Sequence, residues 1–237
     1  MPNVFGPCYY INMTIRKVDL VEGEYYHIYN RGNSKQNIFL DKEDYFRFIS
    51  LLYISNTSES FNLYDLSRSS NFSVYEIDKT DILVHIGAFC LMPNHFHVLI
   101  TQMEENGISK FMQKLSTAYS MYFNKKYKRT GCLFEGKFKS QHVDTDEYLK
   151  YLFSYIHLNP VKLIQKDWKE SGIKNKKTAV DHLLKYSYSS YLDFIGKKRV
   201  ENKILNTESF PKYFIDKTSI TKEVFEWLTH PDTLGKT

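Results

Sequence analysis

The chain has 237 residues, of which 42% are hydrophobic and 25% charged, and it carries a net charge of +5 at pH 7. These values fit a soluble globular protein with one large domain, or one domain with an appendage. No run of about 18 apolar residues is present, so we expect no membrane span. The N-terminal residues lack a secretory signal pattern. Three cysteines without a CxxC pair argue against a disulfide framework and fit a reducing cytoplasm.

The first quarter of the chain predicts a strand and a helix after an irregular start. Residues 1–12 show no clear period, and we expect residues 1–20 to form a poorly ordered N-terminal extension. Alternation over residues 24–31 predicts a strand that ends at a turn. Asp41 is a suitable cap for a helix over residues 41–54, which carries an apolar stripe. The Ser- and Asn-rich residues 56–71 predict a loop.

Two histidines lie in the next predicted strand pair, over residues 82–91 and 95–101, which Met92-Pro93-Asn94 joins. Side chains alternate between the faces of a strand, so His95 and His97 point the same way and Phe96 points the opposite way. Two adjacent imidazoles form half of a metal site. The remaining ligands must come from elsewhere in the chain.

A basic, aromatic-rich window follows, beginning in a predicted helix over residues 107–127. Between residues 110 and 140 there are eight basic residues and one acid, Glu135; the basic residues are Lys110, Lys114, Lys125, Lys126, Lys128, Arg129, Lys137 and Lys139. Lysines interleaved with aromatic rings suit a groove for single-stranded nucleic acid. A solvated helix with inward-facing rings explains residues 109–127 equally well. Residues 128–140 lack apolar periodicity and predict a loop that faces substrate.

A second long helix is predicted over residues 144–158. Asp144 or Thr145 is the expected cap, and Pro160 ends the helix near Asn159. Tyr155 and Asn159 are four residues apart and therefore share a face. A phenol and a carboxamide on one face suit a nucleophile and a metal ligand. Spacing alone leaves Tyr151 open as the nucleophile.

Five segments together resemble a known family. They are Tyr26–Gly32, Ala88–Asn94, His95–His97, Gly131–Ser140 and Tyr155–Lys162. In this order they resemble the single-tyrosine transposases of the HUH nuclease class, and within it the REP-associated and IS200-like branch. The resemblance implies an α+β, ferredoxin-like HUH fold, an antiparallel sheet with helices packed on one face. We expect this domain to span residues 21–165, with a mostly helical C-terminal extension over residues 166–237.

The resemblance also implies an activity. It favours Tyr155 over Tyr151 as the nucleophile of a DNA transposase that forms a 5′-phosphotyrosine intermediate on hairpin-containing single-stranded DNA. It implies that His95, His97 and Asn159 bind a divalent ion, Mg²⁺ or Mn²⁺. Asn159 is one methylene shorter than the glutamine usual at this position. Two alternatives stay open: a metal-dependent phosphohydrolase that uses water, and a non-catalytic module that binds single-stranded nucleic acid.

The DNA contacts are expected at a strand end and in the basic window. The candidates are Asn30, Arg31, Lys110, Lys114, Arg129, Lys137 and Lys139. Phosphate contacts of this kind position nucleic acid without reading its sequence. We expect the protein to act in the bacterial cytoplasm on single-stranded or hairpin DNA, without a membrane partner. A homodimer with shared sites and a monomer both stay open.

Overall fold

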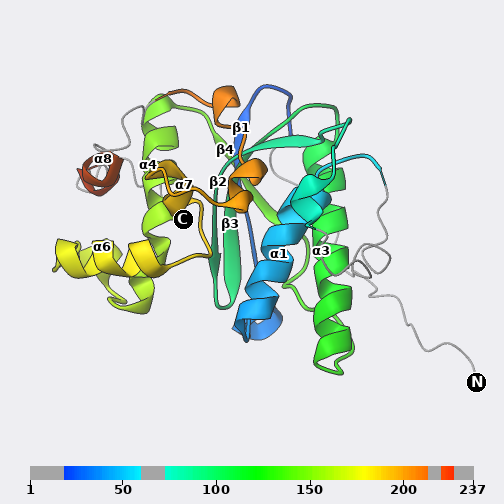
Figure 1. The fold of residues 1–237 in the computed structure, drawn as a ribbon, viewed down its shortest axis with the longest axis horizontal. Helices are drawn as coiled ribbons and strands as arrows, with labels where there is room; N and C mark the ends of the chain where they lie inside the picture. The colour runs from blue at the N-terminus through cyan, green and yellow to red at the C-terminus, as the bar shows by residue number, and fades with distance from the viewer. Residues whose placement is uncertain (1–18, 60–72, 213–219, 227–237) are drawn as a thin grey trace, which may run out of the picture.

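The computed structural model describes residues 19–59, 73–212 and 220–226 (Figure 1). Most of the expected N-terminal extension, residues 1–18, and most of the expected loop at residues 56–71 lie outside these ranges. Within the described ranges, no helix is long and apolar enough to cross a membrane.

The centre of the protein is a four-stranded antiparallel sheet in the order β2-β3-β1-β4. Its strands are β1 (Tyr25–Arg31), β2 (Val84–Met92), β3 (His95–Gln102) and β4 (Lys139–Val143). The first three were predicted, and β2 and β3 form the expected hairpin. The fourth falls at the end of the expected loop. It is a short, polar edge strand in which only Val143 is buried, so it has little apolar alternation to detect.

Helices cover both faces of the sheet, so the expectation that they pack on one face is wrong (Figure 1). The β3 residues Phe96 and Val98 pack with α1 (Lys42–Ile54) and α3 (Gly107–Lys126). Leu99, on the opposite face, packs with α4 (Asp146–Leu158). Both faces of the central strands are apolar, and both must therefore be covered. The α+β class and the antiparallel sheet are as predicted.

The start and end of α4 follow from local chemistry. The Thr145 hydroxyl accepts a hydrogen bond from the backbone N–H of Tyr148 at 3.1 Å, and two acids occupy the first turn. The α-helix ends at Leu158, and a 3-10 turn that contains Pro160 follows. Thr145 is thus the cap among the two candidates, and the end lies where Pro160 predicted it. The Thr145 cap and Pro160 therefore set the start and the end of α4.

Beyond α4, the described residues are mostly helical, and part of them returns to the sheet. Residues 186–190 run along β2, where the Leu91 N–H donates to the Tyr188 carbonyl at 2.9 Å and the Ser190 N–H donates to the Phe89 carbonyl at 3.0 Å. These bonds cover the β2 edge of the sheet. The helices are α5 (Trp168–Ser171), α6 (Lys176–Lys185), α7 (Tyr191–Phe194) and α8 (Ile220–Glu226). The 3-10 segments are Asn33–Lys35, Val74–Glu76, Asn159–Leu163, Val200–Ile204 and Thr207–Ser209. The domain boundary near residue 165 stays a prediction.

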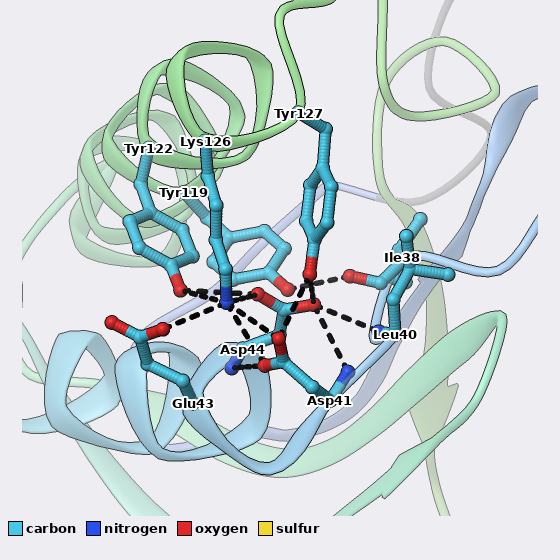
Figure 2. A network of polar contacts seen from close by, with 9 residues as sticks. All are labelled: Ile38, Leu40, Asp41, Glu43, Asp44, Tyr119, Tyr122, Lys126 and Tyr127. Atoms are coloured by element: carbon cyan, nitrogen blue, oxygen red, sulfur yellow. Dashed lines mark hydrogen bonds and ion pairs between the residues drawn. The ribbon is translucent and has the colours of Figure 1, made fainter.

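A polar network joins the start of α1 to the end of α3 (Figure 2). The carboxylate of Asp44 has no exposed surface, and it accepts hydrogen bonds from Tyr127 at 2.8 Å and Tyr122 at 3.0 Å. The Lys126 ammonium lies 2.9 Å from Asp44 and 2.8 Å from Asp41. Asp41 and Asp44 also form a capping box at the start of α1. The network therefore fastens the two helices on the face opposite α4.

The cysteines depart in part from expectation. Cys90 is a free, fully buried thiol in the core, which agrees with the argument against a disulfide framework. Cys132 is disulfide-bonded, which the sequence argument against disulfides did not predict.

Candidate active site

The two histidines of β3 lie side by side on the face that α4 covers. Their ring centroids are 5.0 Å apart, with the ring planes at 88°. One nitrogen of each ring is already held: His95 Nδ1 lies 2.6 Å from Asn94 Oδ1, and His97 Nδ1 lies 2.8 Å from His27 Nε2. The other nitrogen of His97, Nε2, is buried without a hydrogen-bond partner among the described residues. Such orphaned nitrogens are rare in a packed interior and point to a ligand.

All three imidazoles are held neutral. Burial lowers the pKa of His27 to about 3 and that of His95 to about 4, and it lowers the pKa of His97 well below its usual value. For His95 and His97, the positive charges of Lys162 and Lys169 act in the same direction. At neutral pH the rings therefore carry no charge. Neutral imidazole is the form that binds a metal ion.

Tyr155 brings its ring to these histidines from α4. Its ring centroid lies 5.4 Å from that of His97 and 6.3 Å from that of His27, and the side chain is half-buried. Tyr151 stacks on Tyr155 with centroids 6.1 Å apart, and Tyr148 lies a further step along the helix. Among the described ring contacts of these three tyrosines, only those of Tyr155 include a histidine. The phenol of Tyr155 is thus the one best placed for chemistry at the histidines.

Asn159 completes the group at the end of α4. It is 2% exposed, and its Nδ2 has no hydrogen-bond partner within the described ranges. The Asn159 side chain acts on two neighbouring groups: it raises the pKa of His95 and lowers the pKa of Tyr155. Burial is the larger effect on Tyr155 and raises its pKa. The structure therefore brings together the four residues that the sequence singled out: His95, His97, Tyr155 and Asn159.

The residues fit a divalent ion only if an amide takes part. In the described part of the chain, no group of three or more His, Cys, Asp or Glu side chains is arranged to hold a metal. The two neutral imidazoles and the orphaned Nε2 of His97 supply nitrogen donors, and Asn159 is the amide beside them. A set of two imidazoles and one amide oxygen leaves coordination positions for water and phosphate, which suits Mn²⁺ or Mg²⁺.

Sequence reasoning undervalued several residues of this site. His27 was not among the candidate site residues, yet it is buried and its ring holds that of His97. Asn94, directly before His95, fixes the neighbouring imidazole. Trp168 and Lys169, from α5, both contact the Tyr155 ring. Alternation along β1 gave a signal for His27, because it shares a sheet face with His97. No sequence pattern pointed to Lys169.

Four expected DNA contacts lie at the same end of the sheet as His95. Arg31 is paired with His95 across the β1–β3 ladder, and its guanidinium forms a two-pronged ion pair with Glu135. The expected contact Asn30 is buried and donates to the carbonyl of Gly136 at 3.2 Å. The remaining two, Lys137 and Lys139, are exposed on the same loop and on β4.

The other three expected DNA contacts lie on or just after α3, across the sheet from the histidines. Lys110 pairs with Glu104 at 2.7 Å, and Lys114 donates to two backbone carbonyls of residues 57–59. The Arg129 guanidinium lies 5.5 Å from the ring centroid of Phe123. The aromatic side chains Phe111, Tyr119 and Phe123 of α3 are buried in the core, which is the inward-facing alternative left open above. The structure does not bring these three cations to the histidine site.

An antiparallel sheet that presents two neutral histidines to a tyrosine on a covering helix defines a class of site suited to nucleophilic attack beside a metal. Residues 72–159 match the family model described as "Transposase IS200 like", which confirms the resemblance for this part of the chain. The matched segment contains all four site residues. A comparison with curated proteins found no match.

Solved structures add two similar chains. One is described as "Structure of the REP associates tyrosine transposase bound to a REP hairpin"; it is 11% identical, with 80% of this chain and 90% of that chain covered and a TM-score of 0.48. The other is a bacterial tRNA(His) guanylyltransferase-like protein in complex with ATP, at 12% identity, 70% and 69% coverage and a TM-score of 0.36.

Proposed function

We propose that this protein is a transposase that cleaves and rejoins single-stranded DNA through a covalent bond to Tyr155. One observation carries the proposal: the half-buried Tyr155 ring lies 5.4 Å from that of His97, whose Nε2 is buried without a partner in the described structure. A tyrosine held beside two neutral imidazoles has little value to a module that only binds DNA. The match of residues 72–159 to the IS200-like transposase family model supports the same reaction class.

In the proposed step, Tyr155 Oη forms a bond to the scissile phosphorus, and the bond from phosphorus to the 3′ oxygen breaks. The phenol proton passes to solvent, and the departing 3′ oxygen takes up a proton. The products are a 5′-phosphotyrosine and a free 3′-hydroxyl, and a later 3′-hydroxyl reverses the attack. Burial raises the pKa of Tyr155, while Asn159 and the charge of Lys162 oppose that rise. These side chains therefore favour deprotonation for attack.

His95, His97 and Asn159 would hold the divalent ion, Mn²⁺ or Mg²⁺. When bound, such an ion polarises the phosphate oxygens and offsets the charge that develops during attack. The chain's own contribution is orientation: Asn94 holds the His95 ring and His27 holds the His97 ring. Ligands fixed in this way bind a metal more tightly than ligands that must be ordered on binding.

The proposed substrate is single-stranded DNA that carries a hairpin. Arg31, Lys137 and Lys139 lie at the same end of the sheet as His95, exposed or half-buried, and supply positive charge for its phosphates. Arg31 would exchange its partner Glu135 for a phosphate, since a guanidinium forms the same two-pronged contact with either anion. The proposal holds for a monomer and for a homodimer.

The decisive experiment compares Tyr155→Phe with Tyr151→Phe, a matched loss of one hydroxyl a helical turn away. Single-stranded hairpins from the DNA that flanks the gene are labelled at either end and incubated with protein and Mn²⁺. We expect a protein-linked 5′-phosphate on a denaturing gel for the wild type and Tyr151→Phe, and none for Tyr155→Phe. Cleavage that survives in Tyr155→Phe would indicate a hydrolase that uses water. Binding without cleavage in any variant would indicate a binding module.

A further inference from the structure

Tyr29 on β1 lies beside the histidines, in a position where its ring can receive a DNA base. In the sheet it is paired with His97 on β3 and with Lys139 on β4. Residues paired across antiparallel strands point to the same face, so Tyr29 lies between an imidazole and an ammonium. We propose that Tyr29 stacks on an unpaired base next to the cleaved phosphate and so positions the strand. This inference rests on the proposed function, because it names a further contact of the same substrate.

The ring of Tyr29 is not part of the hydrophobic core. It is half-buried, and within the described residues it belongs to neither of the two apolar clusters that fill the faces of the sheet. Its ring contacts are instead with imidazoles, at centroid distances of 4.9 Å to His27 and 6.0 Å to His97. An aromatic ring that borders a polar site and keeps part of its surface open to solvent is available to a planar ligand.

Positive charge flanks the ring of Tyr29. Lys139 is exposed on the edge strand β4, and Arg31 follows Tyr29 by two residues on the same face of β1, where it is paired with His95. Neighbouring strands are about 4.8 Å apart, so the backbone of Lys139 lies roughly 10 Å from that of His97 across the sheet. A strand held at the histidines can therefore pass over Tyr29 with its phosphates beside Arg31 and Lys139. Phosphates beside cations and a base on an aromatic ring are typical of single-strand binding sites.

A stacking role for Tyr29 differs in its consequences from a packing role. A ring that only packs on the imidazoles contributes to metal affinity and leaves DNA binding without metal unchanged. A ring that stacks on a base contributes to DNA binding without metal, and any aromatic side chain can replace it, because stacking requires only an aromatic face. Tyr25 provides a matched control: it is half-buried on the same face of β1, four residues earlier, and packs on Phe210 with ring centroids 5.1 Å apart.

The first test measures stacking directly, in EDTA so that no metal-dependent cleavage takes place. Hairpins carry 2-aminopurine, whose fluorescence is quenched when it stacks, at each position of the single-stranded flank in turn. We expect the wild type, Tyr29→Phe and Tyr29→Trp to quench one position strongly, and Tyr29→Leu to leave that position fluorescent. Tyr25→Leu should quench as the wild type does. Equal quenching by Tyr29→Leu and the wild type at every position would overturn the inference.

The second test separates the base contact from the phosphate contacts by the salt dependence of hairpin binding, measured in EDTA by fluorescence anisotropy. We expect Tyr29→Leu to bind about tenfold more weakly, equivalent to ~1.4 kcal/mol, with an unchanged slope of log affinity against log salt. Lys139→Met should reduce that slope by about 0.7, the value for one phosphate contact of a single strand.

The outcomes for Tyr29 and for the proposed function are distinguishable. Full DNA affinity in Tyr29→Leu, with weakened Mn²⁺ binding, would show that the ring only supports the imidazoles and would contradict the inference. Stacking on Tyr29 in a wild type that forms no covalent adduct would instead leave the base contact standing and refute the proposed function.

Discussion

Two polar clusters lie on opposite faces of the sheet, and they differ in how completely their groups are paired. In the network between α1 and α3, Asp44 accepts hydrogen bonds from Lys126, Tyr122, Tyr127 and the backbone of Leu40 (Figure 2). No side-chain atom of that network is among the buried atoms that lack a partner in the described structure.

The histidine site on the other face is incomplete. His97 Nε2, Asn159 Nδ2 and Trp168 Nε1 are all buried without a partner among the described residues, and all belong to side chains near Tyr155. A paired buried network stabilises a fold, whereas buried polar atoms without partners cost stability and are kept where a ligand completes them. The two clusters therefore differ in how fully their buried polar atoms are paired, and of the two only the histidine site has unpaired buried atoms beside a tyrosine within the described residues.

The largest expected effect is on chemistry at the incomplete cluster. We expect His95→Ala combined with His97→Ala to slow Mn²⁺-dependent cleavage by about a thousandfold, because the ion loses both nitrogen ligands. Binding of DNA without metal, measured by fluorescence anisotropy, should change little. His142→Ala is the matched control, since this histidine lies on the edge strand β4 and pairs there with Glu24 rather than with the site. A double variant as fast as the wild type would show that the site lies elsewhere.

The paired cluster should respond in the opposite way. We expect Asp44→Asn to lower the free energy of unfolding by about 3 kcal/mol, because it leaves the Lys126 charge without its buried partner. Glu43→Gln tests an exposed partner of the same lysine, 68% exposed and 2.9 Å away, and should cost about 0.5 kcal/mol or less. Urea unfolding measures both. Cleavage per folded molecule should be unchanged in each variant, and a loss of activity in Asp44→Asn would contradict the structural role.

The sequence predicted those positions of site residues that depend on local patterns within one strand or one helix. Strand alternation placed His95 and His97 on one face, and helical spacing with Pro160 placed Tyr155 and Asn159 at the end of α4. Local pattern does not say which elements meet across long separations. The helices on both faces and the bond from His27 to His97, 70 residues apart, depend on such contacts.

The misses have the same physical origin. The strand β4 is polar and lies at an edge, so burial imposes no period on it. Lys169 contacts Tyr155 from a turn that is closed by hydrogen bonds within residues 165–174. A lysine in a polar stretch of sequence gives no indication of which residue it will contact. The basic window over residues 110–140 was interpreted as one nucleic-acid-binding surface. In the structure its lysines are separated by the sheet, with Lys110 and Lys114 on one side and Lys137 and Lys139 towards the other.

A smaller effect is expected at the hydrogen bond that holds His97. His27→Leu keeps the site packed but removes the nitrogen 2.8 Å from His97 Nδ1. We expect Mn²⁺ affinity, measured by isothermal titration calorimetry, to fall by about tenfold to a hundredfold, as for other groups that orient a metal-binding histidine. His142→Leu, measured alongside, should leave affinity unchanged. Wild-type affinity in His27→Leu would mean that packing alone orients the imidazole.

The smallest expected effect concerns a buried histidine outside both clusters. His157 is fully buried on α4, its Nε2 lies 2.8 Å from Ser190 Oγ, and burial lowers its pKa to about 3. Because its pKa is about 6.5 in the unfolded chain, the unfolded state binds the proton first as pH falls. The stability from neutral His157 is therefore complete above about pH 6.5 and declines below it, by about 1 kcal/mol between pH 7 and pH 5.5. Urea unfolding at several pH values gives the slope of the unfolding free energy against pH. Below about pH 6.5, this slope should be smaller for His157→Leu than for the wild type, by an amount equivalent to about one proton. An identical slope would mean that His157 takes up its proton without unfolding.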